Sequence, residues 1–179
     1  MPSSSSAAAE AAPAGLRPLA GHYLPDLVYG ANDGIITTFA VVSGVVGASL
    51  SERVIVILGL ANLVADGFSM GASNYLARRS HEDDELAERG DALRHGAATI
   101  LGFVAAGVIP LLAYLAPLDA DVSFAIATGL AGAALFAVGA ARTFVTRRGF
   151  FRSGLEMLLV GALAAAVAFA IGAAAASFA

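Results

Sequence analysis

The sequence has no cysteine and few charged residues, and these two shortages exclude several classes of protein. Without cysteine there is no disulfide framework, no thiolate metal site and no cysteine nucleophile. Only 13% of the 179 residues are charged, against about 25% in an ordinary soluble domain, and the mean hydropathy is +0.78. The net charge of −4 and the pI near 5.2 leave no basic surface for a nucleic acid. A soluble domain, a disordered chain and a nucleic-acid-binding protein are therefore all excluded.

Hydrophobic residues make up 58% of the chain, and they gather in five long apolar stretches. The first stretch has 24 residues, which as a helix reach about 36 Å and cross about 30 Å of hydrocarbon. A segment in lipid must satisfy its own backbone hydrogen bonds, so each stretch is predicted to be a helix. We expect an all-α integral membrane protein with five transmembrane helices. The predicted spans are 27–50, 54–77, 96–117, 122–141 and 154–176.

The polar segments predict how the chain is oriented. Residues 1–22 are rich in Ser, Ala and Pro and lack the apolar core of a signal peptide, so we expect a disordered cytosolic tail before a membrane domain at 23–179. A short acidic segment, 78–95, separates the second and third spans. With the N-terminus inside, nine of the ten arginines lie on the inner side and only Arg53 lies outside. This distribution predicts an N-in/C-out topology.

Two carboxylates, Asp33 and Asp66, lie inside the first and second predicted spans. A central aspartate costs about 2.5–3.5 kcal/mol to insert. The five spans contain no lysine or arginine that would neutralise it. Each aspartate is therefore protonated, in contact with a water-filled cavity, or bound to a cation. A further alternative for each aspartate is a position near an interface that reaches solvent. It applies more to Asp33, which follows Asp26 by only seven residues, than to Asp66, which follows Arg53 by 13.

Polar side chains recur along one face of the second span, where Asn62, Asp66, Met70 and Asn74 follow one another at intervals of four residues. Oxygen ligands suit Mg²⁺, Ca²⁺ and Mn²⁺, and the added thioether favours a borderline ion such as Fe²⁺. The spans contain no histidine or cysteine, which argues against zinc and copper. Met70 has the alternative role of packing in the core.

Acidic residues at the inner side are candidates for metal entry. Four of them belong to the polar segment after the second span: Glu82, Asp83, Glu85 and Glu88. They predict a cytosolic site that collects cations or, alternatively, a solvated helical hairpin in which Glu85 pairs with Arg89. Glu156 opens the fifth span close behind Arg152, and it is either paired with that arginine or the inner mouth of a pathway.

Glycines in the first two spans predict close helix packing. Gly30 and Gly34 in the first span, and Gly67 and Gly71 in the second, have the spacing that lets helix backbones approach closely. We expect these helices to pack tightly, either against each other or across a dimer axis.

Three segments resemble one known family. The first span, DLVYGANDGIITTFAVVSGVVGA, resembles the opening helix of the vacuolar iron transporter family. The second, GLANLVADGFSMGASNYLA, resembles that family's second helix, including its Ala-Asp-Gly-x-Ser-Met core, and the fifth, RSGLEMLLVGALAAAVAFAIG, resembles its last helix. The resemblance extends from about Tyr23 to the end of the chain.

The resemblance implies five spans, N-in/C-out, in a homodimer whose first helices line a pathway on the two-fold axis. It also implies export of Fe²⁺ and Mn²⁺ from the cytosol in exchange for protons. By position, the family's pathway carboxylate corresponds to Asp33 and its pathway methionine to Met70. Typical members insert a long glutamate-rich metal-binding domain where this chain has only Arg78–His95, so the chain is similar to a short branch that lacks this domain.

We therefore predict a homodimeric transporter that exports Fe²⁺ or Mn²⁺ across a lipid bilayer, with no enzymatic activity, cofactor or nucleic-acid partner. Asp33 and Met70 would bind the ion, while Asp66 and Asn62 shape the path. Burial favours the neutral form of Asp33, so this residue would alternate between a proton and a metal. The membrane would be a bacterial plasma or inner membrane, or a vacuole-like membrane in a eukaryote. The alternative is a non-transporting membrane metal sensor, or a structural dimer that uses the acidic segment 82–91.

Overall fold

The computed structural model describes residues 16–80, 87–143 and 149–178, and for residues 16–20 and 87–89 it describes the backbone alone. Helices account for all the regular structure in these ranges, which confirms the predicted all-α class for the described part of the chain. The elements are α1 (Leu16–Gly47), α2 (Glu52–Arg79), α3 (Ala87–Gly107), the 3₁₀ helix η1 (Ile109–Leu115), α4 (Ala120–Ala141) and α6 (Phe150–Ala176).

Local sequence explains where two of these helices end. Glu52 lies in the first turn of α2, and Arg78 and Arg79 lie in its last turn, so the charges at both ends complement the helix dipole. The third apolar stretch changes from α3 to the tighter η1 just before Pro110. Proline has no backbone N–H to donate, so the regular α-helical ladder does not continue through it.

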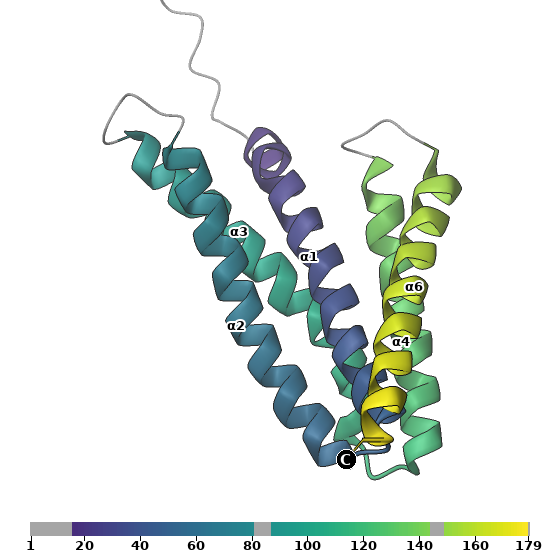
Figure 1. The fold of residues 1–179 in the computed structure, drawn as a ribbon. Coiled ribbons are helices and arrows are strands. Elements are labelled where there is room, and N and C mark those ends of the chain that lie inside the picture. Colours follow the sequence, from purple (N-terminus) through teal and green to yellow (C-terminus); the bar gives the residue numbers. More distant parts are fainter. Residues whose placement is uncertain (1–15, 81–86, 144–148, 179) are drawn as a thin grey trace, which may run out of the picture.

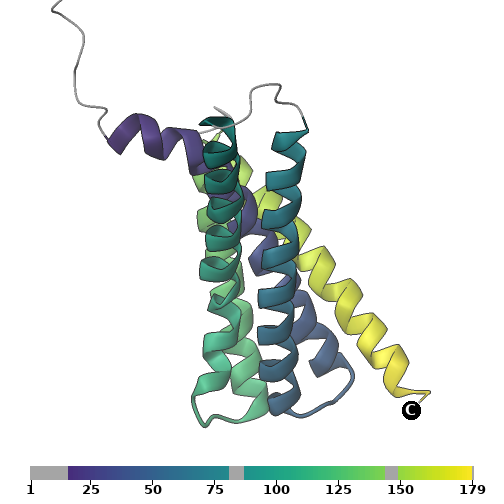
Figure 2. The ribbon, with the colours of Figure 1, turned by 90° about the vertical axis from the view of Figure 1, so that its left-hand side faces the viewer.

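The helices form a bundle that is open at one end and drawn together at the other (Figure 1). We call the end where α1, α3 and α6 begin and where α2 and α4 finish the proximal end, and the opposite end the distal end. The C-terminus of α6 lies at the distal end, so the described chain starts and finishes at opposite ends of the bundle (Figures 1 and 2).

Helix α1 is the central element, and it packs most extensively against α3 and α6. Its first turns run across the proximal end and the rest descends through the bundle (Figure 2). Pro25 lies inside α1, and a proline within a helix is a usual cause of a kink. The bend places the start of α1 beside the start of α3.

Helix α1 begins at Leu16, within the segment 1–22 that was predicted to be a tail. Pro18 lies in its first turn, where a missing N–H costs no helical hydrogen bond. The sequence pattern therefore placed the start of the ordered chain too late for residues 16–22, and residues 1–15 lie outside the described ranges.

The glycines in the first two spans make close helix contacts, as their spacing predicted, but their common partner is α3. A methyl group at Gly30 would overlap the backbone oxygen of Thr99, and one at Gly34 would overlap the backbone oxygen of Phe103. On α2, Gly67 faces the side chain of Phe103 and Gly71 faces Ile100. The glycines thus bring α1 and α2 onto α3 within one chain.

Replacing Gly34 with alanine is therefore expected to destabilise the protein by about 1–3 kcal/mol, because the added methyl must displace backbone rather than a flexible side chain. The thermal unfolding midpoint in detergent measures the effect. Gly129→Ala is the matched control, since space is open around Gly129 on α4. Equal midpoints for the two variants would contradict this description of the α1–α3 contact.

Four helical segments in the described ranges are long and apolar enough to cross a membrane. They are Glu52–Arg79, Gly90–Leu115, Ala120–Ala141 and Phe150–Ala176. Large apolar side chains such as Phe68 and Leu163 are about two-thirds exposed, at 68% and 67%. Outward-facing apolar surface on long helices is what a lipid environment requires, and the protein is a multi-pass membrane protein. Helix α1 is not among the four, because Asn32 and Asp33 interrupt its apolar stretch.

Candidate functional site

A row of polar side chains follows the contact between α1 and α2. Asp33 on α1, and Asn62 and Asp66 on α2, are all half-buried. Asp33 and Asp66 lie close enough for their charges to interact. The structure thus brings together two carboxylates that the sequence placed in separate spans.

Unsatisfied amide groups accompany this carboxylate pair. Within the described ranges, the side-chain oxygen of Asn32 and the side-chain nitrogen of Asn62 are buried and have no hydrogen-bond partner. A buried polar atom without a partner costs about 1–3 kcal/mol. A bound water or ion that contacts these atoms would remove that cost.

Met70 lies one turn from Asp66 on α2, toward the proximal end. It lines a cavity of about 470 Å³ between α1 and α2. The cavity also includes Asp26 and Tyr29 from α1 and Asn74 from α2. Met70 therefore shares a cavity with Asp26, which precedes Asp33 by about two helical turns.

Asp26 is the centre of a polar junction between three helices. Its side chain is 9% exposed, and its Oδ1 accepts a hydrogen bond of 2.7 Å from the Asn74 amide and a weaker contact of 3.4 Å from Arg78. Its Oδ2 lies 2.5 Å from Nδ1 of His95. Asn74 also donates to the Thr99 hydroxyl at 2.7 Å. We call Asp26, Asn74, Arg78, His95 and Thr99 the three-helix junction.

The junction keeps Asp26 ionised. Burial by itself raises the pKa of this carboxyl, but hydrogen bonds from His95 and Asn74 outweigh it and, with the charges of His95 and Arg78, hold the pKa below its ordinary value. An ionised carboxylate only accepts hydrogen bonds, so Nδ1 of His95 is the donor in the contact with Asp26.

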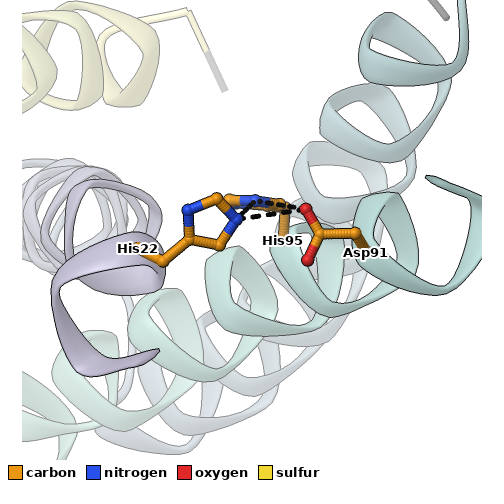
Figure 3. Close-up of side chains that lie close together, drawn as sticks. All are labelled: His22, Asp91 and His95. Atoms are coloured by element: carbon orange, nitrogen blue, oxygen red, sulfur yellow. Dashed lines mark hydrogen bonds and ion pairs between the residues drawn. The ribbon is translucent and has the colours of Figure 1, made fainter. Parts of the chain in front are cut away.

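A second group of ligand-type side chains shares His95 with the junction and is drawn in Figure 3. It consists of His22 from α1 and Asp91 and His95 from α3, and we call it the histidine cluster. Nε2 of His22 lies 3.1 Å from Oδ2 of Asp91 and 3.1 Å from Nε2 of His95. Nε2 of His95 lies 3.3 Å from the same oxygen of Asp91. His95 is 2% exposed, whereas His22 and Asp91 reach the surface.

The predicted metal-entry residues have different positions. Glu82, Asp83, Glu85 and the side chain of Glu88 lie outside the described residues. Glu156 accepts a contact of 3.1 Å from Nε of Arg152 one turn earlier on α6, which is the pairing considered as one of its two alternatives.

Comparison with known proteins identifies the family of this chain. The sequence model of the VIT family matches residues 24–95 and 85–173. The chain belongs to the VIT family. The two matched segments meet at 85–95, the region in which α3 begins.

Several members of the VIT family resemble the chain. A protein of Oryza sativa subsp. japonica named vacuolar iron transporter homolog 1 is 31% identical, with 90% of this chain and 82% of that protein covered. The vacuolar iron transporter 1 of Eucalyptus grandis is 26% identical, with 84% and 85% covered. The vacuolar iron transporter of Plasmodium berghei is 45% identical over 67 residues, but the match spans only 37% of this chain and 24% of that protein.

The VIT family match includes the polar row and all of the three-helix junction, but it begins after His22. Sequence reasoning missed both the junction and the histidine cluster. A signal was present, because His22 and Asp26 are four residues apart, as are Asp91 and His95. Each pair falls on one face of a helix. What the sequence does not show is that the two pairs meet, since they are 69 residues apart along the chain.

Proposed function

We propose that the protein is a membrane transporter for divalent iron or manganese, and that the ion passes between α1 and α2. The observation that carries the proposal is the pair of half-buried carboxylates, Asp33 and Asp66, with interacting charges. The predicted spans hold no lysine or arginine to balance them. Two like charges in a low-dielectric setting require a cation or protons to neutralise them. Membership of a family with members named vacuolar iron transporters agrees with a metal cation.

The ligand chemistry supports Fe²⁺ and Mn²⁺ over other divalent ions. The path offers carboxylate oxygens from Asp33 and Asp66, and amide oxygen from Asn62. Met70 adds a thioether one turn toward the proximal end, at the cavity that Asp26 also lines. Oxygen ligands suit Mn²⁺, and a soft sulfur next to them favours a borderline ion such as Fe²⁺ over Mg²⁺ or Ca²⁺. An ion would meet Met70 before it reaches the carboxylate pair.

Proton exchange follows from the same electrostatics. When no metal occupies the path, protons are the available cations that neutralise Asp33 and Asp66. A metal that enters displaces them, and protons that return release the metal. The carboxylate pair would thus couple the two movements without a separate proton pathway.

The topology that we propose has five spans, with α1 as the fifth in addition to the four apolar segments. Arginines support an inner position for the proximal end, because Arg78, Arg79, Arg142 and Arg152 lie at that end of their helices and Arg53 lies at the distal end. Export from the cytosol would then run from the Met70 cavity toward the distal end. We further propose that two chains form a homodimer, and that the chain belongs to a short branch without the cytosolic domain.

Uptake of Mn²⁺ into proteoliposomes tests the function. With an acidic lumen, the protein should take up Mn²⁺ faster than protein-free liposomes, and collapse of the pH gradient should slow the uptake. Anaerobic Fe²⁺ should enter as well, whereas Ca²⁺ should not. Folded, reconstituted protein that moves neither ion would overturn the proposal and favour the alternative of a metal sensor or structural dimer.

Met70→Leu is expected to change the choice of ion rather than the fold. Leucine has nearly the volume of methionine and costs less than about 1.5 kcal/mol in a packed site, but it removes the sulfur. Fe²⁺ uptake should fall a few-fold relative to Mn²⁺ uptake in the same liposomes. Met157→Leu is the matched control, because Met157 packs against Gly139 of α4, away from the α1–α2 cavity. An unchanged ratio in Met70→Leu would remove this methionine from the path.

A further inference from the structure

The histidine cluster has the geometry of a metal site. The three ligand-type atoms, Nε2 of His22, Nε2 of His95 and Oδ2 of Asp91, form a nearly equilateral triangle with sides of 3.1, 3.1 and 3.3 Å. For an ion about 2.1 Å from each atom, the ligand–metal–ligand angles would be about 95–105°, between the octahedral and tetrahedral values. Side chains from two helices thus converge on one point.

Neighbouring residues fix the ligand atoms in the orientation that a metal needs. Nδ1 of His95 donates to Asp26, so in a neutral imidazole the lone pair lies on Nε2, which faces His22 and Asp91. A carboxylate that holds the far nitrogen of a ligating histidine is the usual outer partner of a metal-bound imidazole. The Tyr23 hydroxyl donates to Oδ1 of Asp91 at 2.6 Å, which leaves Oδ2 directed at the imidazoles.

With a neutral His95, hydrogen bonding alone does not satisfy this triangle. Nε2 of the neutral ring is an acceptor, so its contact of 3.3 Å with the Asp91 carboxylate sets two acceptors against each other. One proton on Nε2 of His22 serves only one of its two neighbours at 3.1 Å. A divalent cation at the centre would accept all three lone pairs at once.

We propose that His22, Asp91 and His95 bind a divalent transition-metal ion, Mn²⁺ or Fe²⁺, at the proximal end of the bundle (Figure 3). Two imidazoles and one carboxylate on one face of an ion are a ligand set that suits iron and its neighbours, and the remaining positions are open to water. His22 and Asp91 are partly exposed, so the ion reaches the site from outside the protein. Mg²⁺ and Ca²⁺ prefer oxygen and bind more weakly.

Asp26 links this site to the cavity between α1 and α2. One of its oxygens holds His95, and the same residue lines the cavity beside Met70. An ion released from the histidine cluster therefore has a negatively charged residue next to it on the way inward. The binding site stands on its own geometry, whereas its role in loading the transport path rests on the proposed function.

Electron paramagnetic resonance of the full chain in detergent, titrated with Mn²⁺ alone, tests the site. Loss of the free Mn²⁺ signal measures affinity, and electron spin echo modulation by ¹⁴N reports imidazole ligation, which the Asp33 path cannot supply. His22→Ala should weaken Mn²⁺ binding about tenfold or more and reduce the nitrogen modulation. Asp91→Asn should weaken binding comparably. Asp121→Asn, in the first turn of α4 at the distal end, is the matched carboxylate control and should bind as the wild type does.

The outcomes separate this proposal from the transport function. Nitrogen modulation that persists in Asp33→Asn and falls in His22→Ala supports the site, whether or not the protein transports. Mn²⁺ bound without nitrogen modulation, or bound equally by His22→Ala and the wild type, overturns it. Transport by the wild type without nitrogen ligation would reject the metal site and support the transport function. Nitrogen ligation without transport would support the metal site and reject the transport function.

Discussion

Replacing Asp33 with asparagine is expected to reduce Mn²⁺ uptake by proteoliposomes to the level of protein-free liposomes. Asparagine keeps the size of the side chain but removes the charge that a dehydrated divalent ion needs. The substitution also removes the second carboxylate, so that Asp66 alone carries a negative charge in the pair. A neutral amide cannot exchange a proton for a metal, so both binding and release would be lost.

The fold should survive this change, because Asp33 is only half-buried and carries an insertion cost of about 2.5–3.5 kcal/mol that asparagine reduces. Monodispersity and the thermal midpoint in detergent check this point. Asp121→Asn provides the matched control, since it makes the same chemical change at an exposed position on α4. Uptake by Asp33→Asn at the wild-type rate would remove Asp33 from the ion path.

Replacing Asp26 with asparagine is expected to cause the largest loss of stability, about 3–5 kcal/mol, because it removes one partner from a buried network of charges. The Asp26 side chain is 9% exposed and holds Asn74 and His95 from two other helices. The amide of asparagine has only one acceptor atom, its oxygen. It therefore cannot accept hydrogen bonds from Asn74 with one terminal atom and from His95 with the other. The thermal midpoint in detergent should fall by several degrees.

The difference in stability between the wild type and Asp26→Asn should also depend on pH, and it should be larger at neutral pH than in the acidic carboxyl range. Because the folded protein holds the pKa of Asp26 below its ordinary value, the stabilisation is complete at neutral pH. It is lost as the pH falls through the ordinary carboxyl range toward the lower pKa of the folded state. The gap in stability between wild type and Asp26→Asn should therefore narrow as the pH falls through the carboxyl range. A gap that stays constant or widens across that carboxyl range would show that Asp26 does not act as an ionised partner.

The helices were predictable because lipid leaves an apolar segment few alternatives to a helix, and the intramembrane aspartates stood out against that background. The glycine spacing likewise predicted close packing. The spacing did not indicate that α3 is the partner, because it describes the surface of one helix and not the surface that packs against it. The same limit applies to Asp33 and Asp66, whose proximity depends on how α1 and α2 pack.

The junction and the histidine cluster were missed for a different reason. His22 fell within the segment predicted to be a tail, and Asp91 was treated as part of an acidic surface. The change of direction in α1 brings His22 beside the start of α3 (Figures 2 and 3). A polar residue acquires its role here from a partner 69 residues away, and periodicity within one helix does not contain that information.

The central claim is that a divalent metal crosses the membrane at Asp33, and it is tested most directly by recording Mn²⁺ uptake and luminal pH in the same proteoliposomes. Wild type and Asp33→Asn are compared at equal amounts of reconstituted protein with an acidic lumen. The account predicts Mn²⁺ entry with a matching loss of luminal protons for the wild type, and neither signal for the variant. Equal signals from both proteins, or no Mn²⁺ entry with folded wild type, would contradict it.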